Sequence, residues 1–161
     1  MLFHPDYMKF RAWDITCEFL TEQGICGLIL DIDNTLTTHD NPKPATQVTD
    51  WLDKMKKAGI GLIIISNNSY QRVTPFANML GLPCVCNAKK PLPGGYKKAV
   101  EQLKLKKEQV AMVGDQIFTD ILGGNVAGVK TILTEPIDTK TELRQIKIKR
   151  KFENLLVRRK Y

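Results

Sequence analysis

Two aspartates stand two positions apart at the end of an apolar run. Asp31 lies near the end of the run 26–32, and Asp33 directly follows it. In an extended segment, residues i and i+2 point to the same side, so both carboxylates would face one pocket. Two carboxylates this close repel each other, and the pair needs a cation or a proton to persist. The alternative is that segment 31–35 forms a turn after a strand and caps the next helix, without a chemical role.

A second pair of acids lies within residues 114–120. Asp115 directly follows another apolar run, and Asp120 comes five residues later, where a helix is expected to begin. Gly114 lacks a side chain, which would let the backbone and a ligand approach each other closely. The alternative is an ordinary helix N-terminus, whose acidic residues interact favourably with the helix dipole.

Further polar residues also follow apolar runs. Ser66 ends the run 60–66 and is followed by Asn67 and Asn68, and the lysine pair 89–90 comes shortly after the run 83–86. Taken singly, a serine or asparagine at such a place is commonly a turn residue, and a lone lysine is normally solvated. What these residues share with the four aspartates is a position just after a predicted strand.

The elements that must position these residues can be read from the apolar patterns. Continuous runs at 26–32, 60–66, 83–86, 109–114 and 129–133 suit strands that are buried on both faces of a parallel sheet. Segments 45–58, 70–80 and 96–103 have helical periodicity, and an N-terminal helix is expected at about 14–24. This alternation predicts a doubly wound, Rossmann-like α/β fold, in which ligands bind outside the carboxyl ends of the strands.

Length and composition indicate one globular domain. The chain has 161 residues, of which 43% are hydrophobic and 25% charged. This composition argues against a disordered protein and against a coiled coil. No apolar stretch approaches the roughly 20 residues of a membrane span, and the N-terminus lacks the pattern of a secretory signal. Four cysteines without a CxxC motif then predict free thiols in a reducing, cytoplasmic compartment.

The net charge of +7 is concentrated in the C-terminal segment. Segment 141–161 holds eight Lys/Arg and two Glu, so six of the seven excess charges lie there. A helical stripe runs through it, made of Ile148, Phe152, Leu155 and Leu156. A basic amphipathic helix of this kind can lie on an anionic membrane, with the aromatic side chains of segment 3–13 as a second contact. Alternatively, both ends pack on the sheet. Nucleic acid is the less favoured partner, because no RNA-reading motif is present.

The order of the motifs resembles that of the haloacid dehalogenase (HAD) phosphohydrolase superfamily. Asp31, Asp33 and Thr35 come first, then Ser66, then Lys90, and then Asp115 with Asp120. This resemblance covers about residues 26–133. Segments 31–36, 65–68, 89–91 and 114–125, together with the basic C-terminus, are similar to the YqeG-type branch of subclass IIIA. That branch is itself similar to mitochondrial phosphatidylglycerophosphate phosphatases, and with it the resemblance extends over nearly the whole chain.

The resemblance implies a catalytic centre. Asp31 would be the nucleophile that forms an aspartyl-phosphate, and Asp33 the general acid and then the general base. Lys90 would supply positive charge beside Asp31; its choice over Lys89 rests on the proline that follows. Mg²⁺ would be held by Asp31, Asp115 and the backbone carbonyl of Asp33.

The remaining roles are also implied by the resemblance. Thr35, Ser66 and Asn67 would form the phosphate- and substrate-binding group, in which Thr35 also braces the loop of Asp33. Asp120 would orient a metal-bound water or Lys90 from behind the site.

The motif spacing bears on the substrate. Ser66 follows Asp33 by 33 residues and precedes Lys90 by 24, which leaves no room for an inserted cap domain. We therefore expect a single capless domain, 1–161, with an open site that suits a large or surface-borne substrate, or a second subunit acting as a lid in a homo-oligomer.

The prediction is a Mg²⁺-dependent phosphatase of phosphate monoesters, with phosphatidylglycerophosphate as the leading substrate and membrane contact through segment 141–161. Alternatives are a phosphatase of soluble sugar, nucleotide or protein phosphates, and a non-catalytic binding module with the same fold. A phospho-receiver domain fits less well, because it gives no role to Asp33.

Overall fold

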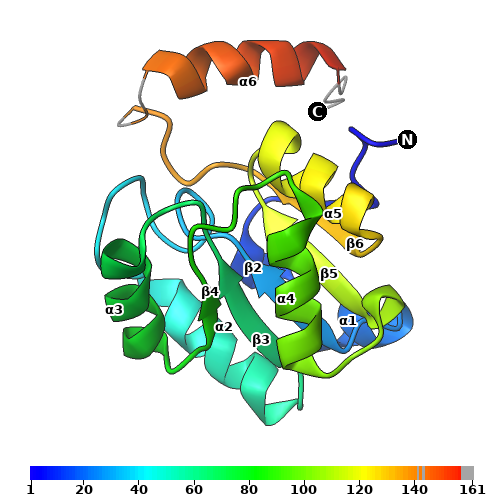
Figure 1. Ribbon diagram of the computed structural model, residues 1–161. Coiled ribbons are helices and arrows are strands. Elements are labelled where there is room, and N and C mark those ends of the chain that lie inside the picture. The colour runs from blue at the N-terminus through cyan, green and yellow to red at the C-terminus, as the bar shows by residue number, and fades with distance from the viewer. Residues whose placement is uncertain (141, 143, 157–161) are drawn as a thin grey trace.

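A six-stranded parallel sheet forms the centre of the computed structural model, which describes residues 1–140, 142 and 144–156 (Figure 1). The strand order is β1-β6-β5-β2-β3-β4. The strands are β1 (Tyr7–Lys9), β2 (Gly27–Leu30), β3 (Gly61–Ile65), β4 (Cys84–Val85), β5 (Val110–Gly114) and β6 (Lys130–Thr134). The helices are α1 (Cys17–Glu22), α2 (Thr46–Lys57), α3 (Tyr70–Leu80), α4 (Pro93–Leu103), α5 (Leu122–Ala127) and α6 (Arg144–Leu156), with short helical turns η1 (Ala12–Asp14), η2 (Lys107–Gln109) and η3 (Ile117–Ile121).

Helices cover both faces of the sheet, which explains the continuous apolar runs. Successive strand residues point to opposite faces. Leu28 and Leu30 pack in the core beneath α2 and α3, whereas Ile29 packs in a second core with Tyr96 of α4. All four residues of β2 are buried, so neither face of this strand tolerates polar side chains. The doubly wound parallel α/β fold is therefore confirmed.

Strand register brings the predicted site residues to one edge. Leu30 lies opposite Ile64 on β3 and Val113 on β5. Because the three strands run parallel and end together, the polar residues that follow them meet at the carboxyl edge of the sheet. Between β2 and β3 the chain forms a loop and α2, and between β3 and β4 it forms α3 with a short loop on either side.

The N-terminal segment differs in detail from the expectation. Helix α1 is shorter than 14–24, and Thr16 caps it by accepting a hydrogen bond from the amide of Phe19 at 3.2 Å. Strand β1, which the sequence analysis did not predict, pairs with β6 at the edge of the sheet. The aromatic residues here lie mostly against the body: the ring of Phe3 meets Phe118 edge-on at 5.8 Å, although Phe10 is exposed.

Helix α6 lies across the end of the molecule, above the body of the domain (Figure 1). Ile148, Phe152 and Leu155 are 51%, 61% and 80% exposed, whereas Glu153 is buried. The interpretation that this stripe packs into the core is therefore wrong for these three residues, because the helix turns its charged face inward. The side chain of Leu156 lies outside the described residues. No helix in the described part of the chain is long and apolar enough to cross a membrane.

Candidate active site

Three buried carboxylates and one buried lysine meet at the carboxyl edge of the sheet. Asp31 follows β2, Asp115 follows β5, Asp120 lies in η3, and Lys90 follows β4. Lys90 Nζ donates to Asp31 Oδ1 at 2.6 Å and to Asp120 Oδ1 at 2.7 Å. The neighbouring Lys89 is exposed, so Lys90 is the lysine that the fold brings to the acids. We call Asp31, Asp115, Asp120 and Lys90 the acid cluster.

Asp120 is fixed by the backbone around it. Its Oδ2 accepts a hydrogen bond from the amide of Gln116 at 3.0 Å, and its carboxyl group packs on Gly114. A β-carbon at Gly114 would overlap this carboxyl group. The missing side chain of Gly114, expected from the sequence to let a ligand approach, instead leaves space that the Asp120 carboxyl group fills. Gly114 thus allows Asp120 to reach Lys90.

Thr35 lies between two of the acids. Its hydroxyl is 3.5 Å from Asp31 Oδ2 and 3.4 Å from Asp115 Oδ1, and the residue is buried. The loop after β2 turns sharply there, because the amides of Thr35 and Leu36 both donate to the carbonyl of Ile32. This turn places Thr35 against the acid cluster.

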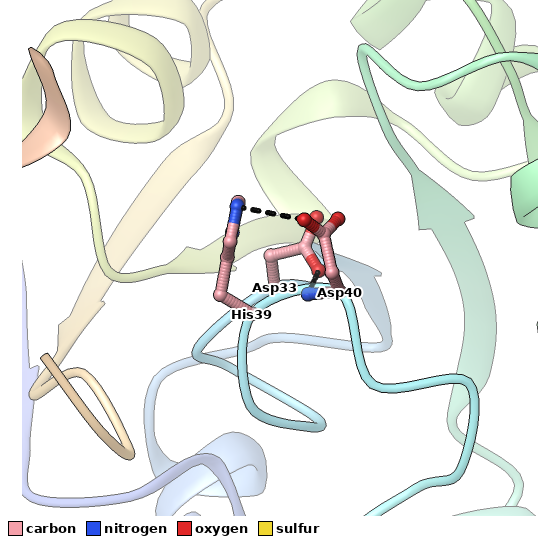
Figure 2. A group of neighbouring side chains, drawn as sticks. All are labelled: Asp33, His39 and Asp40. Atoms are coloured by element: carbon pink, nitrogen blue, oxygen red, sulfur yellow. Dashed lines mark hydrogen bonds and ion pairs between the residues drawn. The ribbon is translucent and has the colours of Figure 1, made fainter. Parts of the chain in front are cut away.

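Asp33 lies outside the acid cluster, in a more open setting. Its carboxylate accepts hydrogen bonds from Asn68 Nδ2 at 2.9 Å, from Arg72 at 3.3 Å and from the amide of Asp40 at 3.2 Å. Figure 2 shows Asp33 and Asp40 side by side, with His39 pairing to Asp40 at 3.2 Å. Three donors thus fix the orientation of the Asp33 carboxylate.

A cavity of about 170 Å³ joins Asp33 to the acid cluster. It is lined by Asp31, Asp33, His39, Ser66, Asn67, Asn68, Lys90, Gln116 and Thr119. Ser66 is buried, and its hydroxyl oxygen accepts from the amide of Asn68 at 3.1 Å. Asn67 uses both side-chain atoms on the backbone of Lys90, at 2.6 and 3.2 Å, so it holds the lysine loop in place.

Burial is the main influence on the ionisation of the acid cluster. It raises the pKa of Asp31 well above its usual value, and nearby Asp120 adds to the rise although Lys90 opposes it. Burial also raises the pKa of Asp115 to about 6, against the opposing effect of Arg150. Burial alone would lower the pKa of Lys90, but Asp120 and Asp31 outweigh it, so that pKa is raised. Without a bound cation, burial and the neighbouring carboxylates therefore favour the protonated forms of Asp31 and Asp115.

The donor set fits a divalent cation. When Arg150, which contacts Asp115, and Glu142, which contacts Arg150, are included, the site holds four carboxylates and two cationic side chains, a formal charge of −2 if all are ionised. One oxygen from each of Asp31, Asp115 and Asp120 lies within 4.8 Å of the others. Carboxylate oxygens are preferred ligands of Mg²⁺, and buried charge requires compensation. A second group, Asp33 with His39 and Asp40, is more exposed.

The structure adds residues that the sequence analysis missed. Arg150 of α6 donates to Asp115, and Glu142 accepts from both Arg150 and Asn34. Arg72 on α3 contacts Asp33. Among the many basic residues of segment 141–161, nothing in the sequence distinguishes Arg150, because its role depends on where the helix lies.

A family model described as "haloacid dehalogenase-like hydrolase" matches residues 38–128, more than half of the chain. The matched range includes Ser66, Lys90, Asp115 and Asp120.

Three curated relatives are phosphatases by name. The "Probable phosphatase YqeG" of Bacillus subtilis is 41% identical over 135 residues, which cover 84% of this chain and 78% of that protein. A "Glyceraldehyde 3-phosphate phosphatase" of Pyrococcus furiosus is 43% identical over 139 residues, 81% of this chain and 55% of that protein. "Phosphatidylglycerophosphate phosphatase 1, chloroplastic/mitochondrial" of Arabidopsis thaliana is 27% identical over 161 residues, with coverages of 94% and 45%. The chain thus spans about half the length of the last two relatives.

Solved structures agree on the fold. A protein from Listeria monocytogenes aligns with a TM-score of 0.60 at 20% identity, over 74% of this chain and 85% of that chain. NagD from E. coli K-12 aligns with a TM-score of 0.58 at 15% identity, over 68% of this chain and 87% of that chain. At such identities the likeness concerns the fold alone.

Proposed function

Because this chain belongs to the haloacid dehalogenase-like hydrolases and is a phosphatase, we propose that it hydrolyses phosphate monoesters through an aspartyl-phosphate on Asp31. The observation that carries the proposal is the pairing of Asp31 with Lys90 at the wall of a cavity that also holds Asp33 and Ser66. A nucleophile, a cation and a second acid are thus present together, as phosphoryl transfer to a carboxylate requires.

Mg²⁺ is the cofactor that we propose. Asp31, Asp115 and the backbone carbonyl of Asp33 would hold it, and the −2 charge of the site supports a divalent ion. When bound, it would keep the nucleophile ionised and offset the repulsion between that carboxylate and an anionic phosphate.

In the first half-reaction, a carboxylate oxygen of Asp31 attacks phosphorus and the bond to the ester oxygen breaks. Asp33 gives its proton to the departing alkoxide, and the alcohol leaves. In the second half-reaction, Asp33 takes a proton from a water that attacks the aspartyl-phosphate, and inorganic phosphate is released. General acid–base assistance of this kind is worth about 10²–10⁴-fold in rate.

Other residues hold the reacting groups. Lys90 and the Ser66 hydroxyl lie in the same cavity as Asp31 and would bind phosphoryl oxygens. Thr35 would brace Asp31 against Asp115, and Asp120 would hold Lys90 in place. We assign Asn67 to positioning Lys90, although it also lines the cavity and could touch the substrate.

For the substrate we propose a lipid-borne phosphate monoester, phosphatidylglycerophosphate. The name of the Arabidopsis relative supports it. The exposed stripe of α6, Ile148, Phe152 and Leu155, also supports it, because lysines and an arginine flank that stripe and suit an anionic membrane surface. A soluble sugar phosphate is the second candidate, favoured by the name and 43% identity of the Pyrococcus relative.

The mechanism is tested with Asp31→Asn, which removes the nucleophile. We expect turnover of p-nitrophenyl phosphate with Mg²⁺ to fall by roughly 10⁴–10⁶-fold. Asp53→Asn, an exposed aspartate on α2, is the matched control and should keep the wild-type rate. Asp33→Asn should instead accumulate the aspartyl-phosphate, which mass spectrometry of the acid-quenched enzyme would locate on Asp31. Wild-type turnover by Asp31→Asn would exclude this mechanism, and no turnover by the wild type on a broad panel of phosphomonoesters would favour a non-catalytic module.

The substrate is tested by comparing phosphate release from phosphatidylglycerophosphate in anionic vesicles and from glyceraldehyde 3-phosphate. The double variant Phe152→Ser/Leu155→Ser should slow the lipid reaction about tenfold. In free energy, this factor is smaller than the contribution of one fully buried apolar side chain. The soluble reaction should not change. Met79→Ser, which replaces an exposed apolar residue on α3, is the control. A deletion after residue 140 is unsuitable, because it would also remove Arg150. Equal rates with all variants on both substrates would contradict the membrane proposal.

A further inference from the structure

The carboxylate of Asp115 has a different partner on each oxygen. Oδ1 lies 3.4 Å from the Thr35 hydroxyl, and Oδ2 accepts from Arg150 Nη2. Arg150 Nη1 also donates to the backbone carbonyl of Asp115 at 3.2 Å. One guanidinium therefore fixes both the side chain and the backbone of the same residue, and Oδ1 stays on the side of the acid cluster.

Arg150 is itself held by a buried acid. Its Nε lies 2.8 and 2.9 Å from the two carboxylate oxygens of Glu142, and its Nη2 also contacts Glu142. Glu142 and Asp115 are buried, and the arginine side chain is only 11% exposed. A planar guanidinium between two carboxylates is a rigid arrangement, because its donors match the carboxylate geometry.

The same acid reaches the loop of the nucleophile. Glu142 Oε1 accepts from Asn34 Nδ2 at 2.7 Å, and Asn34 lies between Asp33 and Thr35. The side-chain oxygen of Asn34 accepts from the amide of Asp138 at 3.1 Å. Asn34 has a φ of 61°, a left-handed conformation that asparagine tolerates better than most residues. This chain of contacts links the loop after β2, the loop after β5 and α6.

We propose that Arg150, held by Glu142, is a positioning residue that fixes Asp115 as a metal ligand. The inference rests on the proposed function, in which Asp115 is a ligand of Mg²⁺; the contact of Oδ2 with Arg150 would leave Oδ1 for the ion. Its physical basis is that hydrogen bonds to the outer oxygen of a ligating carboxylate orient the ligand, and loss of such a partner typically costs 10–100-fold in metal affinity. In this proposal, the inward face of helix α6 supports the catalytic centre through Arg150, while its apolar stripe faces outward.

The test measures metal binding directly. Mn²⁺ serves as the probe, and the free ion is followed by electron paramagnetic resonance during titration of the wild type, Arg150→Gln, Arg150→Lys and Arg144→Gln. We expect Arg150→Gln to bind Mn²⁺ 10–100-fold more weakly. Arg150→Lys should bind more weakly than wild type by a smaller factor, because it keeps the charge without the two-pronged geometry. Arg144→Gln, an exposed arginine on the same helix, should bind as the wild type does.

Two comparisons make the result decisive. The single variant Glu142→Gln is titrated as well, and the double variant Arg150→Gln/Glu142→Gln should weaken binding by less than the product of the two single effects, because both residues act through one contact. Thermal melts without metal accompany every titration. If Arg150→Gln melts at a lower temperature but binds Mn²⁺ as tightly as wild type, Arg150 is only structural, and tighter binding would show that it competes with the metal. If Arg150→Gln does not fold, Arg150→Lys decides in the same way.

These outcomes are separate from those that test the proposed function. A wild type that binds no Mn²⁺ would refute the metal site itself. A wild type that binds Mn²⁺ but hydrolyses no ester would leave the positioning role of Arg150 intact.

Discussion

Replacing Lys90 with methionine should damage both stability and catalysis, because this lysine is the cation between two buried acids. Lys90 Nζ lies 2.6 Å from Asp31 and 2.7 Å from Asp120, and the three side chains are 4%, 9% and 1% exposed. Methionine has a similar length and volume, so the change mainly removes the charge and leaves little empty space.

The expected size follows from this burial. Removing one partner of a buried ion pair costs about 3–5 kcal/mol, since the remaining charge must be neutralised or solvated. The loss should be smaller at low pH, where the acids take up protons, and smaller with Mg²⁺, which replaces part of the missing charge. Loss of a positive group beside the transferred phosphoryl should also lower kcat by roughly 10²–10³-fold.

Lys89→Met is the matched control. Lys89 is the adjacent residue but is exposed. Its backbone is left-handed, with a φ of 55°, and methionine should adopt this conformation about as readily as lysine does. Urea unfolding and steady-state phosphate release would be measured for both variants. A free energy of unfolding for Lys90→Met within about 0.5 kcal/mol of wild type, the usual range of surface substitutions, would contradict a buried ion-pair role for Lys90. Equal losses of stability and activity in the two variants would contradict it as well.

Three further predictions concern stability. Burial raises the pKa of Asp115 to about 6, whereas in the unfolded chain this side chain has its usual pKa of 3.8. Between about pH 4 and 6 the metal-free folded protein therefore holds a proton on Asp115 that the unfolded chain has lost. The free energy of unfolding in EDTA should fall by up to ~3 kcal/mol as the pH rises over that range, and Mg²⁺ should abolish this decline. Urea titrations at several pH values check this, and a free energy that rises over that window would contradict it. Burial also raises the pKa of Glu153, and the second carboxylate oxygen of Glu153 has no hydrogen-bond partner among the described residues. Replacing Glu153 with glutamine removes this buried charge, so Glu153→Gln should raise the free energy of unfolding at pH 7.5 by about 1 kcal/mol. A lower free energy of unfolding in denaturant melts would contradict this. Gly114→Ala should destabilise by about 1–3 kcal/mol and lower kcat, because the new methyl group overlaps Asp120. Gly94→Ala meets open space in α4 and should stabilise by up to ~1 kcal/mol, so equal losses in both glycine variants would refute the steric argument.

The sheet could be predicted because its strands are buried on both faces. The run 60–66 has no polar residue before Ser66, and each of the five predicted runs overlaps a strand of the sheet. Strand β1 could not be predicted in this way. It has three residues, only partly buried, and the amide of Thr131 on β6 bonds to the side chain of Asp6 just before it, so its place depends on a distant partner.

The site could be predicted to the extent that its residues directly follow strands. Asp31, Ser66 and Asp115 are of this kind, and the parallel topology places Asp115 beside Asp31 and places Ser66 with Asp31 along one cavity. Arg150 and Glu142 lie on a segment whose place on the body is not encoded in any local pattern. The apolar stripe of α6 even favoured the opposite orientation, because amphipathicity normally indicates which face is buried.

The contact between Arg150 and Asp115 has a consequence for the timing of biosynthesis. Arg150 is 35 positions after Asp115 and 119 positions after Asp31. At about 5–20 residues per second, a ribosome adds Arg150 roughly 2–7 s after Asp115. During that interval a nascent domain can form its sheet, but it lacks the guanidinium that orients Asp115, so we expect the newly made protein to bind metal at full affinity only once α6 has emerged.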